Sequence, residues 1–589
     1  MRRAIVLLLF VVALLVGVPA SAAVAPFGPP TSTGTGGAAA SVETLATQAA
    51  IDTLKAGGNA VDAAVAAAGV LGVTEPFSCG VGGGGFMVIR TAGGKVTTID
   101  GRETAPAAMT PTSFWENGAA LKFDPARWSG LSVGVPGTPA TWAEALEKYG
   151  TMTLAQVLQP GIGVATNGFV VDQTFFNQTN GAKPWFDDIP ATAALYLDPD
   201  GTPHDVGTVF RNPDLARTYE RIAHLGAKGF YRGAIADALV DTVQHPVVAP
   251  TADHIWRHGV MTMRDLHTYV APERAPTHVN YRGLDVYSMG PPSSGGSTVG
   301  EALNILEGYP NLSTMPRADA FHYFLEASRY SFADRNAYLA DPDYYPVPLS
   351  GLLSEEYATT RRNKITTTAA SPPVVAPGDP YPFVTGRASA TATQSETTTH
   401  LTTSDKWGNV VSYTVTIEST GGSGLLVPGW GFLLNNELTD FNYDSTTHPN
   451  RVEGGKRPRS SMAPTIVLKN DNPFLALGSP GGSTIITTVL QILFDRLDQG
   501  MTLPQAIADP RASQRNTADA SGVETTAAEP AFLTSPLKTE LEAKGHHFTN
   551  GGEIGAATGI EFLGGGNVLA AAEPVRRGTG SALVENPAP

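Results

Sequence analysis

A run of threonines stands where an irregular stretch of the chain gives way to a strand-like one. Residues 366–397 are rich in Thr, Ala, Ser and Pro and lack a periodic apolar pattern, which is typical of a mobile linker. A threonine directly after such a linker can act as a nucleophile without His or Asp. Its hydroxyl attacks the preceding carbonyl, the ester hydrolyses, and the freed α-amine becomes the general base. We therefore predict cleavage between Thr397 and Thr398, with Thr398 as the nucleophile.

The residues after Thr398 favour a β-hairpin. Thr399–Thr403 is strand-like, Asp405–Asn409 has turn composition, and Val410–Ile417 alternates between apolar and polar residues. A bare threonine run is more common in strands than in catalytic sites, so it is the position at the end of the linker that indicates catalysis.

Two glycine motifs suggest other enzymes, but their contexts do not fit. Gly80–Gly85 matches the dinucleotide pattern G-x-G-x-x-G, yet it opens a predicted strand, Phe86–Ile89, instead of a helix. Gly130–Gly134 matches the G-x-S-x-G elbow of α/β-hydrolases, but Pro136 and Pro139 delay the helix that must follow. We expect a tight glycine turn at the first site and an ordinary loop at the second.

The cysteine and histidine content gives no sign of a metal site or cofactor. Cys79 is the single cysteine, so no intrachain disulfide can form, and we expect its thiol to be buried and inert. The 12 histidines include no H-E-x-x-H motif, and His546 and His547 are expected at the surface. No cofactor and no metal is predicted.

Charge and the N-terminal residues limit the partners and the location. The net charge of −15, without a basic run, disfavours nucleic acid. Arg2 and Arg3, the apolar run Ala4–Val18 and the small residues at 20–22 form a signal-peptide pattern, with cleavage expected after Ala22. The apolar run is too short for a membrane span. We expect a mature protein without a retained span that is secreted, periplasmic or extracellular.

Further elements are predicted from periodicity and from Gly and Pro positions. The predicted helices lie within 42–72 (broken at Gly57–Asn59), 138–170 and 298–340, most clearly at Arg317–Leu339, and at Thr484–Leu497; the predicted strands include Val96–Asp100 and Ala463–Leu468.

Six blocks of sequence resemble the γ-glutamyltransferase (glutathione hydrolase) family and occur in the family's order. They are Gly57–Ala66, Gly80–Phe86, Gly101–Pro106, Leu433–Phe441, Arg457–Thr465 and Gly478–Ser483. In addition, Thr398–Asn409 resembles the start of the family's small subunit. The resemblance implies an α+β fold of the N-terminal nucleophile hydrolase type, a four-layer αββα sandwich with two central sheets. It also implies two self-cleaved subunits, residues 23–397 and 398–589.

The same resemblance implies roles for individual residues. Arg102 should bind the substrate α-carboxylate bidentately, with the hydroxyls of Ser460 and Ser461 beside it. Glu437 and Asp440 should receive the α-ammonium. In addition, the N–H groups of Gly481 and Gly482 should hold the oxyanion and Thr416 should support the nucleophile.

Two positions depart from some family members. Glu418 stands where some carry Asn, and an acid there still suits an ammonium. Only Asn442–Lys456 separates Phe441 from Arg457, whereas some relatives have a longer lid there. A more open site that admits larger γ-glutamyl substrates is therefore expected.

Three functions remain open. The first is hydrolysis of glutathione-like γ-glutamyl donors with transfer to water or to amino-acid or dipeptide acceptors. The second is a cephalosporin or glutaryl acylase, whose substrate has the terminal carboxylate but no α-ammonium and would not need Glu437 and Asp440. The third is an unprocessed binding homologue, which failure to self-cleave would reveal.

Overall fold

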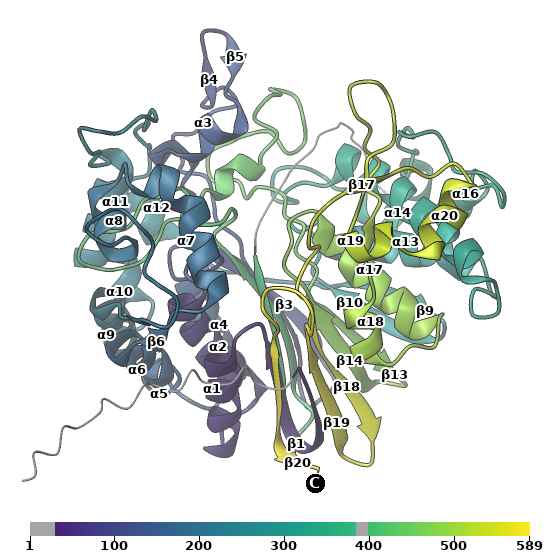
Figure 1. The fold of residues 1–589 in the computed structure, drawn as a ribbon, viewed down its shortest axis with the longest axis horizontal. Coiled ribbons are helices and arrows are strands. Elements are labelled where there is room, and N and C mark those ends of the chain that lie inside the picture. Colours follow the sequence, from purple (N-terminus) through teal and green to yellow (C-terminus); the bar gives the residue numbers. More distant parts are fainter. Residues whose placement is uncertain (1–29, 385–397, 589) are drawn as a thin grey trace, which may run out of the picture.

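The computed structural model describes residues 30–384 and 398–588. Figure 1 shows layers of strands in the middle of the molecule, with helices covering them on both sides. This arrangement is the predicted α+β sandwich, with its helical layers outside and its strands inside.

The central strands form one 13-stranded sheet. Its order is β8 (Glu273–Arg274), β3 (Val96–Gly101), β2 (Gly84–Arg90), β12 (Val410–Thr416), β11 (Thr399–Ser404), β1 (Thr31–Ser41), β19 (Asn567–Ala572), β18 (Thr558–Gly564), β14 (Asn472–Gly478), β13 (Thr465–Lys469), β10 (Leu284–Ser288) and β9 (Thr277–Tyr281), with β20 (Ser581–Pro587) paired to β1.

The two expected sheets are therefore joined, and β1 joins them. Residues 31–35 of β1 pair with β19, whereas residues 38–41 pair with β11. Gly36 lies between these halves with a φ of +89°, a conformation that favours glycine. β1 thus passes from one layer to the other, which the sequence-based prediction of two separate sheets missed.

One helical layer covers the β2–β12–β11 half of the sheet. Its main members are α1 (Thr44–Lys55), α2 (Ala60–Thr74), α4 (Thr138–Tyr149), α5 (Leu154–Val157), α6 (Gln159–Asn167), α9 (Pro213–Leu225), α10 (Lys228–Tyr231) and α11 (Ala234–Gln244). Asn59 caps α2 and forms a capping box with Asp62. Every residue of α2 is buried, in keeping with its Ala- and Val-rich sequence. The predicted break at Gly57–Asn59 is confirmed.

The other helical layer covers the β14–β13–β10 half. It contains α13 (Gly295–Glu307), α14 (Arg317–Tyr338), α16 (Glu355–Arg362), α17 (Thr484–Leu497), α18 (Leu503–Ala508), α19 (Pro530–Leu533) and α20 (Pro536–Glu542). The predicted helix after Pro316 and the predicted helix at 484–497 are both confirmed.

The remaining helices and strands complete the described chain. They are β4 (Trp115–Glu116), β5 (Ala119–Ala120), α3 (Phe123–Arg127), η1 (Gly130–Ser132), β6 (Phe169–Val170), α7 (Gln173–Phe186), α8 (Pro190–Tyr196), β7 (Val209–Phe210), α12 (Met263–Thr268), α15 (Leu349–Leu352), η2 (Tyr381–Phe383), η3 (Glu437–Asp440), β15 (Ala512–Ser513), β16 (Thr526–Ala528) and β17 (Phe548–Asn550). No helix of the described residues is long and apolar enough to cross a membrane.

The predicted linker is only partly described. Residues 366–384 lie against the rest of the protein, where Arg329 donates to the carbonyls of Pro372 (3.2 Å) and Pro373 (2.8 Å). Residues 385–397, including Thr397 of the predicted cleavage site, lie outside the described residues, as does the predicted signal peptide.

The histidine pair near the C-terminus differs from its prediction. His547 is exposed, but His546 is fully buried and lies 2.8 Å from His322, measured between ring nitrogens. The prediction of a surface position is therefore wrong for His546, because the turn after α20 places adjacent side chains on opposite sides. Cys79 is buried as expected, and burial raises the pKa of its thiol.

Candidate active site

Strand register brings the predicted nucleophile, its neighbour and the arginine to one edge of the sheet. Thr399 pairs with Val415 on β12, Thr416 pairs with Gly84 on β2, and Gly85 pairs with Gly101 on β3. Thr398 directly precedes β11, Thr416 ends β12 and Arg102 directly follows β3, so the three residues lie at the same edge of the sheet. The strands form two hairpins that are far apart in the sequence, β2 with β3 and β11 with β12, and the antiparallel pairing of β12 with β2 aligns them.

The hydroxyl of Thr398 is held by a short chain of hydrogen bonds. Thr398 is 1% exposed, and its Oγ1 donates to Thr416 Oγ1 at 3.3 Å. The Glu418 N–H in turn donates to Thr416 Oγ1 at 2.8 Å. Glu418 has a φ of +75°, which is rare for a residue with a side chain and is found at constrained functional sites. The turn after β12 thus orients Thr416 toward the nucleophile.

The glycine turn before β2 fits closely against this corner. A Cβ on Gly83 would lie 2.0 Å from the carbonyl oxygen of Thr416, and one on Gly82 would lie 2.0 Å from that of Leu433. Only glycine permits this approach of backbone to backbone. The motif therefore packs beside the nucleophile and opens a strand, as expected for a tight turn.

The G-x-S-x-G motif at Gly130–Gly134 forms a different structure from a hydrolase elbow. Ser132 is buried in η1, and its Oγ donates to the carbonyls of Arg127 (2.7 Å) and Ser129 (2.8 Å). The next helix, α4, begins only at Thr138. Ser132 therefore does not stand on a strand-to-helix elbow.

Removing the Thr416 hydroxyl tests its link to Thr398. We expect Thr416→Val, which keeps the side-chain shape, to lower kcat/KM by roughly 10- to 100-fold, because one hydrogen bond that orients the nucleophile is lost. Thr416→Ser should recover most of the rate. Steady-state kinetics on both variants, with melting temperatures as a folding control, checks this. A fully active Thr416→Val enzyme would show that Thr416 does not act on Thr398.

A fully buried charged cluster lies next to this edge. Arg102 forms ion pairs with Glu437 and Asp440, both on the 3-10 helix η3, and all three side chains are inaccessible to solvent. The Arg102 guanidinium also donates from Nε to the Pro458 carbonyl (3.1 Å) and from an Nη to the Arg459 carbonyl (3.0 Å). The structure therefore brings together the arginine and both acids that the sequence predicted.

The two predicted serines lie on the segment that Arg102 holds. Ser461 Oγ accepts a hydrogen bond from Arg335 of α14 at 2.6 Å, and Ser460 Oγ accepts the N–H of Met462 at 3.1 Å. Arg335 was not among the predicted residues, because no local pattern relates the last turn of a helix to a loop more than a hundred residues away. Ser460 and Ser461 are both fully buried.

The short segment after η3, residues 442–456, makes hydrogen bonds that hold the acids in position. Asn450 donates to the Asp440 carbonyl at 2.7 Å and accepts the Arg459 N–H at 2.8 Å. Glu418 accepts from Ser419 and from Asn436, the residue that precedes η3. The segment from 442 to 456 thus holds the charged cluster in place.

Glu103 is an additional acid that the sequence reading passed over as a site residue. It directly follows Arg102 and is fully buried. Burial raises the pKa of its carboxyl to about 8, against the opposing effect of the Arg102 charge. Burial thus favours the uncharged form of Glu103, and the carboxylates that pair with Arg102 are those of Glu437 and Asp440.

The glycines predicted to hold the oxyanion lie in the loop between β14 and α17. Gly481 and Gly482 have φ values of +128° and +62°, which favour glycine. Among the described residues, neither N–H group donates a hydrogen bond within the protein. A Cβ on Gly478, the last residue of β14, would lie 2.3 Å from the ring of His400. That contact places this loop near the beginning of β11, where Thr398 lies.

His400 is a structural residue in this arrangement. Its ring lies between the two halves of the sheet, with Nδ1 2.8 Å from Thr414 Oγ1 and Nε2 3.2 Å from Thr402 Oγ1. Burial lowers the pKa of His400 to about 3. Nε2 also lies 3.5 Å from Ser412 Oγ, so His400 stays uncharged among strand hydroxyls and makes no hydrogen bond with Thr398, which does not suit a general base.

This shift predicts a loss of stability in acid. Below about pH 6.5 the unfolded chain protonates His400 while the folded chain does not, so the free energy of unfolding should fall by about 1.4 kcal/mol per pH unit until the pH approaches 3. Denaturant unfolding between pH 7 and 4 should show a smaller fall for His400→Asn. Equal slopes for the two proteins would contradict the buried, neutral imidazole.

Arg577 is a second residue that the sequence reading missed. One of its Nη groups donates to the Thr398 carbonyl at 3.2 Å, and the other lies 2.6 Å from Glu75 Oε2. It thereby fixes the backbone of the nucleophile to the loop after α2. Two adjacent arginines near a C-terminus carry no periodic signal from which this contact could be predicted.

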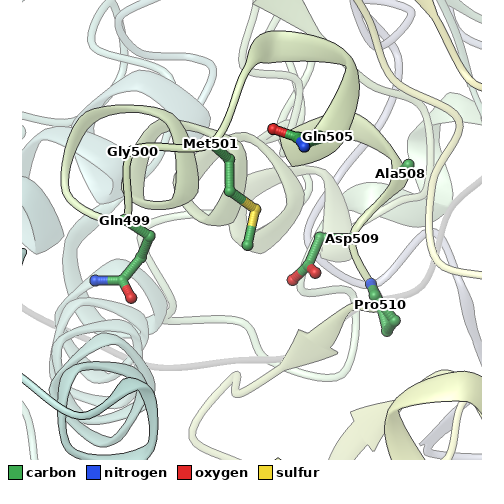
Figure 2. Close-up of a pocket in the computed structure, with 7 residues that line it drawn as sticks. All are labelled: Gln499, Gly500, Met501, Gln505, Ala508, Asp509 and Pro510. Atoms are coloured by element: carbon green, nitrogen blue, oxygen red, sulfur yellow. The ribbon is translucent and has the colours of Figure 1, made fainter.

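One polar cluster and one cavity lie apart from these residues. Among the described residues, Asp188, Asp253 and His254 could together hold a cation, but Asp188 already accepts from His254 (2.9 Å) and Trp256 (2.8 Å). A cavity of about 440 Å³ is formed by α18 and the segments on either side of it, and Figure 2 shows the residues that line it. One of them, Asp509, is paired with Arg317 at 2.6 Å. None of the predicted site residues lines that cavity.

Comparison with known proteins agrees with this geometry. The family profile described as Gamma-glutamyltranspeptidase matches residues 46–583. The chain is 40% identical over 490 residues to the glutathione hydrolase proenzyme of Bacillus subtilis strain 168, covering 81% of this chain and 80% of the relative. It is 37% identical over 588 residues to that of Escherichia coli K12, covering 96% of each.

A solved structure extends the similarity to the fold. The crystal structure of a cephalosporin acylase from Bacillus halodurans superposes with a TM-score of 0.80 and 29% sequence identity, covering 95% of this chain and 97% of the acylase. The matched region includes every predicted site residue, from Arg102 to Gly482. This chain belongs to the γ-glutamyltranspeptidase family.

Proposed function

We propose that the protein is a self-processing γ-glutamyl hydrolase and transferase that acts on glutathione-like donors. The observation that carries this proposal is the buried Arg102 flanked by Glu437 and Asp440. A γ-glutamyl group ends in an α-carboxylate and an α-ammonium. It can exchange with both ion pairs at once, with its carboxylate taking Arg102 and its ammonium taking the two acids.

Maturation would begin at the Thr397–Thr398 bond. The Thr398 hydroxyl attacks the Thr397 carbonyl, the C–N bond breaks, and water hydrolyses the resulting ester to free the α-amine of Thr398. The products would be Ala23–Thr397 and Thr398–Pro589, once a signal peptide has been removed after Ala22. The relatives in Bacillus subtilis and Escherichia coli are both named proenzymes, which supports processing.

Turnover would then use the same hydroxyl. The free α-amine, with a pKa near ~7.7–8, removes its proton as it attacks the γ-carbonyl of the donor. The N–H groups of Gly481 and Gly482 stabilise the oxyanion, and the leaving amine takes the proton. Water or an acceptor amine next attacks the γ-glutamyl ester on Thr398 and regenerates the free threonine.

Binding energy for the head group would come from the charged cluster and the serines. Arg102 binds the carboxylate together with Ser460 and Ser461, and Glu418 adds a further carboxylate near the acids. Because the segment from 442 to 456 is short, larger γ-glutamyl substrates would also be able to enter the site. Export by the predicted N-terminal signal would put the activity outside the cytoplasm.

A glutaryl or cephalosporin acylase is the second candidate, because an enzyme of that kind has the same fold at 29% identity. Its substrate would use Arg102 but leave Glu437 and Asp440 without an ammonium. A glutamyl donor supplies a partner for every charge of the buried cluster, whereas a glutaryl donor does not, and this difference favours the glutamyl donor.

One assay separates these functions. The purified protein is given a chromogenic γ-glutamyl anilide and its glutaryl analogue, each with and without a dipeptide acceptor. We expect cleavage of the γ-glutamyl anilide, faster with acceptor, and little cleavage of the glutaryl compound. The reverse preference would indicate an acylase, and an intact chain inactive on both would indicate a binding homologue.

A further inference from the structure

A second cavity lies beside the oxyanion glycines. It has a volume of about 510 Å³, within the size range of small-molecule sites. It is lined by Gly481, Ser483, Thr484, Arg515 and Glu553, with residues of β16, β17 and the loop before β18. None of the head-group residues, Arg102, Glu437, Asp440, Ser460 or Ser461, lines it. The cavity therefore adjoins Gly481 of the predicted oxyanion pair and is separate from the residues predicted to bind the γ-glutamyl head group.

Two contacts connect this cavity to the nucleophile. Arg577 donates from its side chain to the Thr398 carbonyl at 3.2 Å and from its backbone N–H to Glu553 Oε2, also at 3.2 Å. Glu553 lines the cavity and Arg577 contacts Thr398, so a single residue lies between the two. A molecule in the cavity would be close to the ester formed on Thr398.

Arg515 places a positive charge on the cavity wall, which also carries the carboxylate of Glu553. Its guanidinium forms no ion pair with any carboxylate in the described part of the chain, and its Nε is buried without a hydrogen-bond partner. One Nη donates to Ser483 Oγ at 2.7 Å. Burial lowers the pKa of Arg515, with no acid offsetting that effect. A partly buried arginine whose Nε lacks a hydrogen-bond partner is stabilised when a ligand supplies a carboxylate.

The backbone around Arg515 is fixed on both sides. Ser513 Oγ lies 2.7 Å from Thr487 Oγ1 on α17, and Asn516 exchanges two hydrogen bonds with Val375, at 2.8 and 3.0 Å. The guanidinium is therefore held in place before any ligand arrives. The N-terminal end of α17, which begins at Thr484, faces the same cavity and adds a partial positive charge.

We propose that this cavity binds the C-terminal carboxylate of the amino acid or short peptide on the amine side of the scissile bond, through Arg515. The inference rests on the proposed γ-glutamyl chemistry. In acylation the occupant is the leaving amine. In transfer it is the acceptor, whose amine attacks the ester carbonyl. The new C–N bond then forms as the Thr398 C–O bond breaks, and the amine proton passes to Thr398.

Matched donors test this assignment. γ-Glutamylalanine and its C-terminal amide differ only in the carboxylate that Arg515 would bind. We expect the wild type to prefer the acid over the amide in kcat/KM by roughly tenfold or more, the size expected for a charge-assisted hydrogen bond. Arg515→Gln should abolish this preference and Arg515→Lys should keep part of it. Arg232→Gln, which alters an exposed arginine outside the cavity, should keep all of it.

The same contrast applies to acceptors. Transfer from the γ-glutamyl anilide to glycylglycine should depend on Arg515, whereas transfer to glycylglycine amide should not. An unchanged acid-to-amide ratio in Arg515→Gln would overturn the assignment, even if the overall rate fell.

Failure of the proposed function would look different, because the wild type would then cleave neither γ-glutamyl donor nor the anilide. In that event saturation-transfer NMR of alanylalanine with the wild type and with Arg515→Gln decides the point. Loss of the binding signal in the variant would support the subsite, and equal signals would overturn it.

Discussion

Thr398→Ala is expected to remain a single chain and to lose activity on γ-glutamyl anilide by roughly 10⁴-fold or more. The same hydroxyl would attack the Thr397 carbonyl in maturation and the donor carbonyl in turnover, so its removal blocks both steps. Thr398 is buried and hydrogen-bonded to Thr416, and its removal leaves no second hydroxyl in the same place. A denaturing gel, intact mass and steady-state rates measure the two effects.

Two neighbouring variants control this experiment. Thr398→Ser keeps a hydroxyl and should still cleave and turn over, at a reduced rate. Thr399→Val keeps the shape of the next residue, whose buried Oγ1 has no hydrogen-bond partner in the described chain, and should mature normally. A mature, active Thr398→Ala protein would move the nucleophile elsewhere.

Asp440→Asn is expected to cost roughly 30-fold or more on a γ-glutamyl substrate and little on its glutaryl analogue. Loss of one partner of a desolvated charge pair costs ~2–5 kcal/mol, and each ~1.4 kcal/mol is tenfold. Asp440 is fully buried against Arg102, and only the γ-glutamyl group brings an ammonium to replace that partner. The ratio of kcat/KM for the two substrates is the quantity to measure.

Equal losses on both substrates would mean that Asp440 has a structural role only. Arg102→Lys is the companion variant, because both substrates carry the carboxylate that Arg102 would bind. A lysine ammonium cannot match the four groups that the guanidinium contacts, namely Glu437, Asp440 and the carbonyls of Pro458 and Arg459. Both rates should therefore fall, and near-normal turnover would remove Arg102 from the site.

Local patterns were sufficient to predict many elements. Gly57–Asn59 separates α1 from α2, Pro316 precedes α14, and the alternation after Asp405–Asn409 gives β12 within one residue of its predicted end. In each case a turn residue or a periodic pattern acts within a few residues. The structure also places the predicted Arg102, Glu437 and Asp440 in contact.

Long-range arrangement was not predictable in the same way. β1 (Thr31–Ser41) has Gly, Thr and Ala in place of an apolar alternation, yet it joins both layers of the sheet. Arg335 and Arg577 reach the site from helices and loops distant in sequence, and His546 is buried by its contact with His322. Such contacts depend on tertiary packing, which a single sequence without periodic signals does not reveal.

The most direct test of the proposed mechanism is to trap the acyl group on the protein. The wild type is mixed with a γ-glutamyl donor, quenched in acid and analysed by peptide mass spectrometry. The proposed mechanism predicts a fragment that begins at Thr398 and gains the mass of one γ-glutamyl group on that residue. An active protein that remains uncleaved, or that carries the acyl group on any other residue, would contradict it.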